Sequence, residues 1–209
     1  MIDQPTLGTK DKIIGKAMDL FWRQGYEATG VAQIQSEAGV LAGSFYFFFK
    51  SKETLLLAVL DRYMEILHSA LRDPVVRKTR DPVERVFTLL DFYRRQIKES
   101  RFELGCPIGN LALELGNRSP AAREKLNALF HEWRAMVESF LADAEDRFPV
   151  GTDFKAISTF VLTTMEGGIM LARANQDVRQ FDRAVRELRN YLNLMQTGRK
   201  TVSRKRSQT

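Results

Sequence analysis

The stretch "GVLAGSFYFFF" at residues 39–49 puts four phenylalanines and one tyrosine in its last five positions. Before it, residues 31–38 hold apolar side chains at helical spacing. Gly39 interrupts this pattern, and residues 42–49 resume it as a second short helix. Two short helices joined by a tight, glycine-containing turn are typical of a helix-turn-helix motif.

The aromatic run has an inward and an outward face. On a helix that turns by about 100° per residue, Phe45 and Phe49 coincide and Phe48 lies at their edge, so we expect these three in a core. Gly43 and Phe47 then point the other way. An outward phenyl ring indicates a face that meets a partner, although Phe47 packing on a neighbouring helix is the alternative.

The rest of the chain also predicts helices. Glycine and proline are sparse, and the apolar residues between them recur every three to four positions without strict alternation. Ser51, Ser119 and Thr152 stand where hydroxyl-bearing N-caps are expected. The predicted fold class is therefore all-α. The expected helices span 9–24, 31–38, 42–49, 52–72, 82–99, 107–116, 120–147, 153–175 and 179–197.

Composition narrows the possible classes of protein. The chain has 209 residues, and its first twenty contain no long apolar stretch, so we expect a soluble, cytoplasmic protein. The net charge is +6, but five basic residues and no acidic one lie within 198–209. This segment predicts a disordered tail, with a DNA-contacting arm as the alternative. One cysteine and two distant histidines lead us to expect neither metal nor cofactor.

A more specific pattern occupies the first quarter of the chain. The stretch "IIGKAMDLFWRQGYEATGVAQIQSEAGVLAGSFYFFFKSKETLLLAVL" resembles the DNA-binding domain of the TetR (tetracycline-repressor-like) family, with "I..EAGV", "GS.Y..F" and "SKE.LL" in register. The resemblance implies a DNA-binding helix-turn-helix domain at 1–51. A helical effector-binding and dimerisation domain would follow at 52–197, and the basic tail at 198–209.

The resemblance also implies which residues meet DNA. Tyr46 and Lys52 match positions that contact phosphates, and Gly43 lies on the side that faces the bases. Ala42 departs from the family pattern, where a cation or polar residue is common, and Phe47 and Phe48 stand where His or Tyr is common. These changes remove hydrogen-bonding groups, so we expect readout to rest more on apolar contact and DNA shape. The expected DNA-binding residues are Thr29, Ala42, Gly43, Ser44, Tyr46, Phe47, Lys50 and Lys52.

Dimerisation is expected on two grounds. A two-fold dimer reads two half-sites about 34 Å apart, which one short helix cannot do. In addition, "TTMEGGIMLARANQD" at 163–177 resembles a family helix that packs against its copy in the partner subunit, and paired glycines suit close helix approach. The expected interface residues are Gly167, Gly168, Leu188, Tyr191 and Leu192.

The stretch "ELGCPIGNLALELGN" at 103–117 suggests a sensor. Pro107 would begin a helix, which places Cys106 at the N-cap, where the helix dipole favours a thiolate. The Gly-Cys-x-x-Gly-Asn motif resembles a branch of the family, parts of which respond to electrophiles or oxidants; a buried core cysteine is the alternative. Glu166 is expected to pair with Arg173, to anchor a ligand, or to lie exposed. The expected effector or sensor residues are Cys106, Phe102, Trp133, Phe160, Met165, Glu166 and Met170.

These observations predict a homodimeric repressor that binds a palindromic DNA operator and is released by a small-molecule or reactive effector. The alternative is a helical ligand-binding or interaction protein with weak or lost DNA binding. No set of residues for nucleophilic or metal-assisted catalysis stands out in the sequence, so we expect no enzyme.

Overall fold

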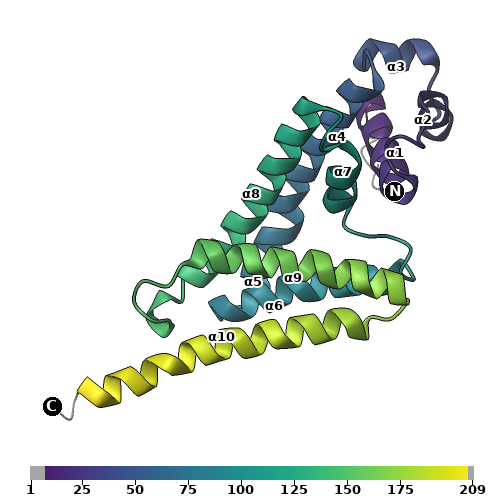
Figure 1. The fold of residues 1–209 in the computed structure, drawn as a ribbon. Coiled ribbons are helices and arrows are strands. Elements are labelled where there is room, and N and C mark those ends of the chain that lie inside the picture. Colours follow the sequence, from purple (N-terminus) through teal and green to yellow (C-terminus); the bar gives the residue numbers. More distant parts are fainter. Residues whose placement is uncertain (1–7, 207–209) are drawn as a thin grey trace, which may run out of the picture. The chain divides into compact units, whose positions relative to one another are not determined.

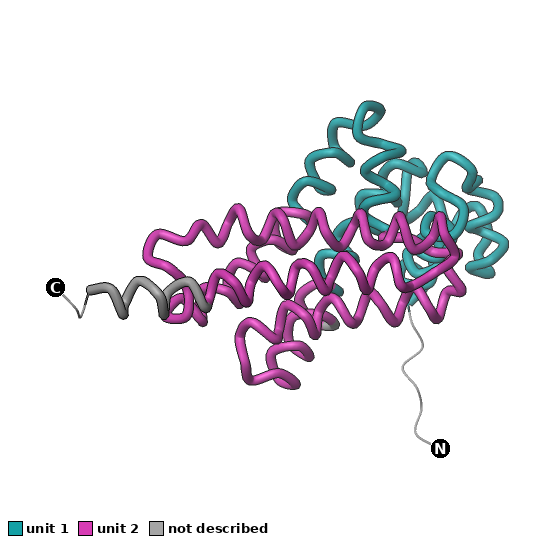
Figure 2. Tube along the Cα trace, turned by 60° about the horizontal axis from the view of Figure 1, so that its bottom comes forward, with its two compact units in different colours: residues 1–66, 107–129 teal, residues 67–106, 130–209 magenta. Residues whose placement is uncertain are grey.

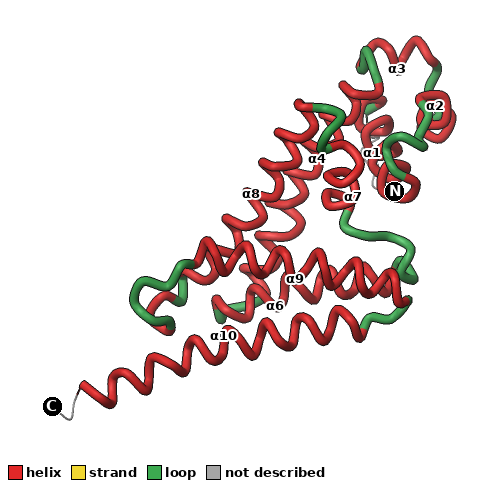
Figure 3. The backbone as a smooth tube through the Cα atoms, viewed as in Figure 1, coloured by secondary structure: helices red, strands yellow, loops and turns green. Residues whose placement is uncertain are grey.

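The computed structural model describes residues 8–206, with side chains up to Gln196 except that of Ala70. All regular elements in this range are helices (Figure 1, Figure 3), which confirms the all-α prediction. The last helix, expected to end at 197, continues to Arg206, into the basic tail predicted at 198–209. The side chains from residue 197 onward, and residues 207–209 altogether, lie outside the described part. The elements are α1 (Thr9–Gln24), α2 (Val31–Ala38), α3 (Ala42–Phe48), α4 (Lys52–Ile66), η1 (Leu67–Arg72), α5 (Asp73–Lys78), α6 (Pro82–Glu99), α7 (Pro107–Leu115), α8 (Pro120–Ala142), η2 (Glu145–Arg147), α9 (Phe154–Asn175) and α10 (Arg179–Arg206).

Two of the three predicted hydroxyl caps are present. Ser51 Oγ accepts a hydrogen bond from Thr54 N at 3.1 Å, and Ser119 Oγ accepts one from Ala122 N at 3.1 Å. The prediction for Thr152 is wrong. Asp153 caps α9 instead, accepting from Ala156 N at 2.9 Å. A carboxylate one residue further on is the stronger acceptor for the free N–H groups and suits the positive end of the helix dipole.

The helix predicted at 52–72 is divided. α4 ends at Ile66, a π-helical segment η1 follows, and α5 continues to Lys78. Pro74, in the first turn of α5, explains the change, because a proline ring clashes with the carbonyl four residues before it. The wider turns of the π-helical segment avoid that clash, so that the helical structure continues from α4 into α5.

The chain forms two compact units (Figure 2). The head unit contains the described residues up to Ile66 together with Pro107–Leu129, and the bundle unit contains Leu67–Cys106 and the described residues from Phe130 onward. This division differs from the expected boundary at residue 51. The head unit keeps all of α4 and adds α7 and the first half of α8.

The head core explains this division. α1 contributes a stripe that includes Ile13 and Phe21, and the core continues through Leu56 of α4 and Leu111 of α7. All of these side chains are almost completely buried, and each buried leucine or isoleucine contributes about 1.5–3 kcal/mol of transfer free energy. Without α7 the helix-turn-helix would expose part of its own core.

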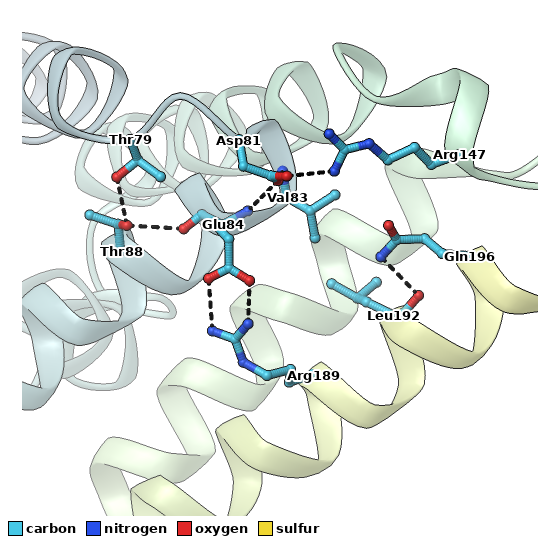
Figure 4. A network of polar contacts seen from close by, with 9 residues as sticks. All are labelled: Thr79, Asp81, Val83, Glu84, Thr88, Arg147, Arg189, Leu192 and Gln196. Carbon is cyan, nitrogen blue, oxygen red and sulfur yellow. Dashed lines mark hydrogen bonds and ion pairs between the residues drawn. The ribbon is translucent and has the colours of Figure 1, made fainter.

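The bundle unit is built from α5, α6, α9, α10 and the second half of α8. Its core takes Val86 and Leu90 from α6, Phe140 from α8, Val161 from α9 and Phe181 from α10. A network of polar contacts joins the start of α6 to η2 and to α10 (Figure 4). In the network, one carboxylate caps α6 and pairs with Arg147, and another pairs with Arg189. The two carboxylates belong to Asp81 and Glu84.

Candidate nucleic-acid interface

α3 presents two different faces, as its sequence predicts. Phe45 is completely buried and Phe49 is 3% exposed, so both anchor the helix in the head core. Phe48 is 38% exposed, which corrects its expected place in the core. Its ring instead meets that of Phe47 edge to face, with 4.9 Å between the centroids. The two rings together form an apolar ridge on the outside of the helix.

The outward face of α3 is exposed along its length. Phe47 is 75% exposed, Tyr46 is 48% exposed, and Leu41, which precedes the helix, is 81% exposed. Within the described part of the chain, no heavy atom would lie within 4 Å of a Cβ on Gly43, apart from those of its own chain neighbours and helix backbone. The predicted residues Ala42, Gly43, Ser44, Tyr46 and Phe47 thus share one exposed surface. Packing of Phe47 on a neighbouring helix is excluded within the described residues.

A rigid turn leads into this motif. Thr29 is completely buried; its hydroxyl donates to Gly25 O at 2.6 Å and accepts from Gln24 Nε2 at 3.2 Å. Its N–H donates to Tyr26 O at 3.1 Å. Thr29 therefore holds the turn before α2, and in this structure its side chain is not accessible to a phosphate.

The two predicted lysines also make contacts inside the head unit. Lys52 Nζ donates to Tyr26 O at 3.0 Å and to Thr29 O at 3.1 Å, and it lies 4.1 Å from the centroid of the Tyr26 ring. Two of its three N–H donors are thereby used within the protein. Lys50 Nζ donates to Tyr46 O at 3.0 Å, close to the negative end of α3. Both lysines stiffen the motif in addition to any contact with DNA.

Glu114 of α7 binds two backbone N–H groups of the same turn. Its carboxylate accepts from Tyr26 N at 2.9 Å and from Glu27 N at 2.7 Å. Gly25 has φ +87°, a backbone conformation that favours glycine, and a Cβ there would lie 3.1 Å from Glu114 Oε2, so the carboxylate would have to shift slightly. Burial, with Glu53, Glu27 and Glu114 nearby, raises the pKa of Tyr26. We call Lys52, Glu114 and the turn of residues 25–29 the turn clamp.

The turn clamp gives a first prediction. Lys52→Ala removes two charge-assisted hydrogen bonds and a cation–π contact, and because the site is half-buried we expect a loss of about 1–2 kcal/mol of stability. Lys50→Ala is the matched control, since the exposed Lys50 makes one such bond. Chemical denaturation would measure both. Equal midpoints for the two variants would mean that the clamp does not stabilise the head unit.

A buried polar cluster lies in the bundle unit. Trp133 Nε1 donates to Tyr93 Oη at 2.9 Å, and the Cys106 thiol donates to the Glu166 carboxylate. Burial raises the pKa of Tyr93, and the neighbouring Cys106 and Glu166 add to the effect. Burial also raises the pKa of Glu166, although the hydrogen bond from Cys106 acts in the opposite direction. The other carboxylate oxygen, Glu166 Oε1, is buried and has no hydrogen-bond partner among the described residues.

The remaining predicted effector residues are distributed differently. Met165, which precedes Glu166 on α9, is buried. Phe102 is half-buried in the loop before Cys106 and has φ +66°. Phe160 and Met170 are 46% and 63% exposed, which places them on the outside of the bundle unit rather than in an interior site. Arg173 does not pair with Glu166; it donates to Glu103 O at 2.9 Å.

The predicted dimer residues also separate into two groups. Gly168 approaches α10 of its own chain, where a Cβ would lie 2.9 Å from Phe181 Cδ2. Leu188 and Leu192 are buried in the same core, so these three positions are corrected to contacts within the chain. A helix does approach the glycine pair closely, as inferred, but it does so at Gly168 and not at Gly167. The accessible positions are Gly167 and Tyr191.

The chain is similar to known proteins over most of its length. Residues 13–59 match the family model described as "Bacterial regulatory proteins, tetR family", and residues 82–188 match "Tetracyclin repressor-like, C-terminal domain". The HTH-type transcriptional regulator LmrA of Bacillus subtilis is 32% identical over 168 residues, which cover 78% of this chain and 86% of LmrA.

Solved structures agree with this result. A TetR transcriptional regulator from Chloroflexus aurantiacus is 28% identical, has a TM-score of 0.78 and covers 88% of this chain and 94% of its own. A cysteine mutant of the TetR family regulator CifR, solved in complex with double-strand operator DNA, is 26% identical with a TM-score of 0.74, covering 90% of this chain and 98% of its own. None of the helices in the described residues is long and apolar enough to cross a membrane.

Proposed function

Since the chain belongs to the TetR family of DNA-binding transcriptional regulators, we propose that it is a cytoplasmic repressor that binds a palindromic operator as a homodimer. An effector bound in the bundle unit would release it. The protein would act by binding alone, without catalysis. The helical ligand-binding protein with lost DNA binding remains the competing hypothesis, and it predicts no affinity for any duplex.

The exposed outward face of α3 carries this proposal. The face holds five of the eight residues expected to meet DNA, and nothing within the described head unit covers it. Selection of operator sequences from random duplex DNA by the purified full chain is the direct test. We expect recovery of a two-fold symmetric site whose half-sites are one helical turn apart. Failure to enrich any sequence would favour the competing hypothesis.

An exposed apolar stripe in the bundle unit supports the homodimer. Phe160, Gly167 and Leu171 recur along one side of α9, and Tyr191 and Leu194 lie exposed on α10. The rings of Phe160 and Tyr191 meet edge to face at 5.5 Å, so the two helices share one surface. A second copy of the chain would bury this surface in an isologous contact.

The polar cluster supports an effector site in the bundle unit. The unpartnered Glu166 Oε1 suits a ligand with a hydrogen-bond donor, because a buried acceptor without a hydrogen bond costs about 1–3 kcal/mol of stability. Cys106 suits an electrophile instead, although its thiol is buried and hydrogen-bonded to a carboxylate. Screening for compounds that release the operator from wild type and from Cys106→Ser would separate the two classes.

The chain itself offers a route from this cluster to DNA. Cys106 directly precedes Pro107, where α7 begins, and Glu114 of that helix grips the turn before α2. Displacement of Cys106 by a ligand would thus be transmitted along the chain to α7 and to the turn clamp. An effector releases DNA only if it binds better to the arrangement that cannot bind DNA.

Glu166 gives a prediction in terms of pH. Because its pKa is raised in the folded state, its contribution to stability is present below the unfolded pKa and is lost as the pH rises through the folded pKa. Glu166→Gln stays neutral, so its melting temperature relative to that of wild type should increase as the pH rises above about 4.3, the ordinary pKa of a glutamate. The exposed Glu145→Gln is the matched control. A pH-independent difference for Glu166→Gln would show that this carboxyl does not titrate abnormally.

A further inference from the structure

The chemistry of the α3 surface limits what it can read in DNA. The helix, "AGSFYFF", contains no amide, carboxylate or cationic side chain, and its hydrogen-bonding side chains are Ser44 and Tyr46. The bidentate pairs that identify guanine or adenine need Arg, Lys, Asn or Gln. α3 therefore cannot form them.

The most exposed side chains of this surface are apolar. Leu41 and Phe47 are 81% and 75% exposed, and the ring centroids of Phe47 and Phe48 lie 4.9 Å apart. Gly43 lies one helical turn before Phe47 and leaves open space beside it. Such a surface gains free energy only where it meets another apolar group, and in the major groove that group is the C5-methyl of thymine.

We propose that Phe47 and Leu41 recognise thymine C5-methyl groups, so that the operator half-site is read by methyl burial rather than by paired hydrogen bonds. This inference rests on the proposed function, because it assumes that α3 lies in the major groove. It assigns the class of base that the regulator recognises. Specificity at those positions then distinguishes thymine from cytosine and from purines by shape and hydrophobicity.

Deoxyuridine substitution tests the inference directly. Uracil pairs like thymine and lacks only the methyl group, whose burial corresponds to about a fourfold change in affinity. Replacing each operator thymine in turn should weaken binding about fourfold at contacted positions, and about fifteenfold when both symmetric half-sites are changed. Substitutions outside the half-sites are the control and should leave the affinity unchanged.

A double-mutant cycle assigns the contact to a residue. Phe47 and Leu41 are exposed, so Phe47→Ala and Leu41→Ala should not disturb folding. In each variant, the loss of affinity caused by deoxyuridine should vanish at the thymine that the replaced residue contacts. Two results overturn the proposal: normal operator binding with no loss at any deoxyuridine, or the same loss in both variants as in wild type. Absence of any operator binding would instead reject the function on which it rests.

Discussion

Gly43→Leu is expected to reduce operator affinity at least about a hundredfold without destabilising the protein. Specific binding exceeds non-specific binding by about a thousandfold or more, and most of that difference depends on close fit in the groove. The position lies at the centre of the outward face, so a leucine there would hold the helix away from the bases. Among the described residues, a Cβ at Gly43 would have no heavy atom within 4 Å apart from its chain neighbours and its own helix backbone.

The stability of this variant should stay the same or rise slightly, because leucine has a helix propensity about 0.8 kcal/mol better than glycine. Gly15→Leu is the matched control. Gly15 also lies exposed in a helix of the head unit, and a Cβ there would have no other residue that the structure describes within 4 Å, its chain neighbours and own helix backbone aside. Fluorescence anisotropy and thermal melts would compare the two. If both variants bind operator DNA equally well, α3 does not enter the groove.

Leu171→Glu is expected to convert the proposed dimer to monomers and to abolish high-affinity operator binding. Leu171 is 47% exposed on the apolar stripe of α9, and a two-fold contact would bury two unpaired carboxylates together. A separated monomer loses the effective concentration, on the order of millimolar, that linkage gives the second half-site. We expect the loss in affinity to be at least about a hundredfold.

Val150→Glu is the control for this change, since Val150 is completely exposed and lies between η2 and α9, outside the stripe. Sedimentation velocity would give the oligomeric state, and anisotropy the affinity. A dimeric Leu171→Glu protein that still binds the operator would place the interface on another surface. Monomeric Val150→Glu would mean that added charge alone explains the result.

The elements that could be predicted from sequence are those whose cause is local. The bounds predicted for α1 and α2 agree with the structure, because periodicity and the flanking glycines depend on neighbouring residues. The buried face of α3 follows from the spacing of Phe45 and Phe49. Phe48 was misplaced since a helical wheel gives direction but not the width of the core that receives it.

Contacts between distant residues could not be predicted. Glu114 lies 88 residues after Tyr26, and nothing in a single sequence pairs an acid on one helix with the N–H groups of a remote turn. Gly168 shows the same problem: the sequence indicated a close helix approach, but it could not say whether the partner was Phe181 of the same chain or a second subunit. The two glycines look identical in sequence and differ only in what lies opposite them.

The grip of Glu114 on the turn at residues 25–29 determines how this regulator can be recombined with others. A DNA-binding module cut after residue 66 would lack Leu111 and Leu115 from its core and the acceptor for two N–H groups. A chimera that exchanges ligand domains must therefore carry residues 107–129 along with the N-terminal segment. The transplantable unit is therefore discontinuous in sequence.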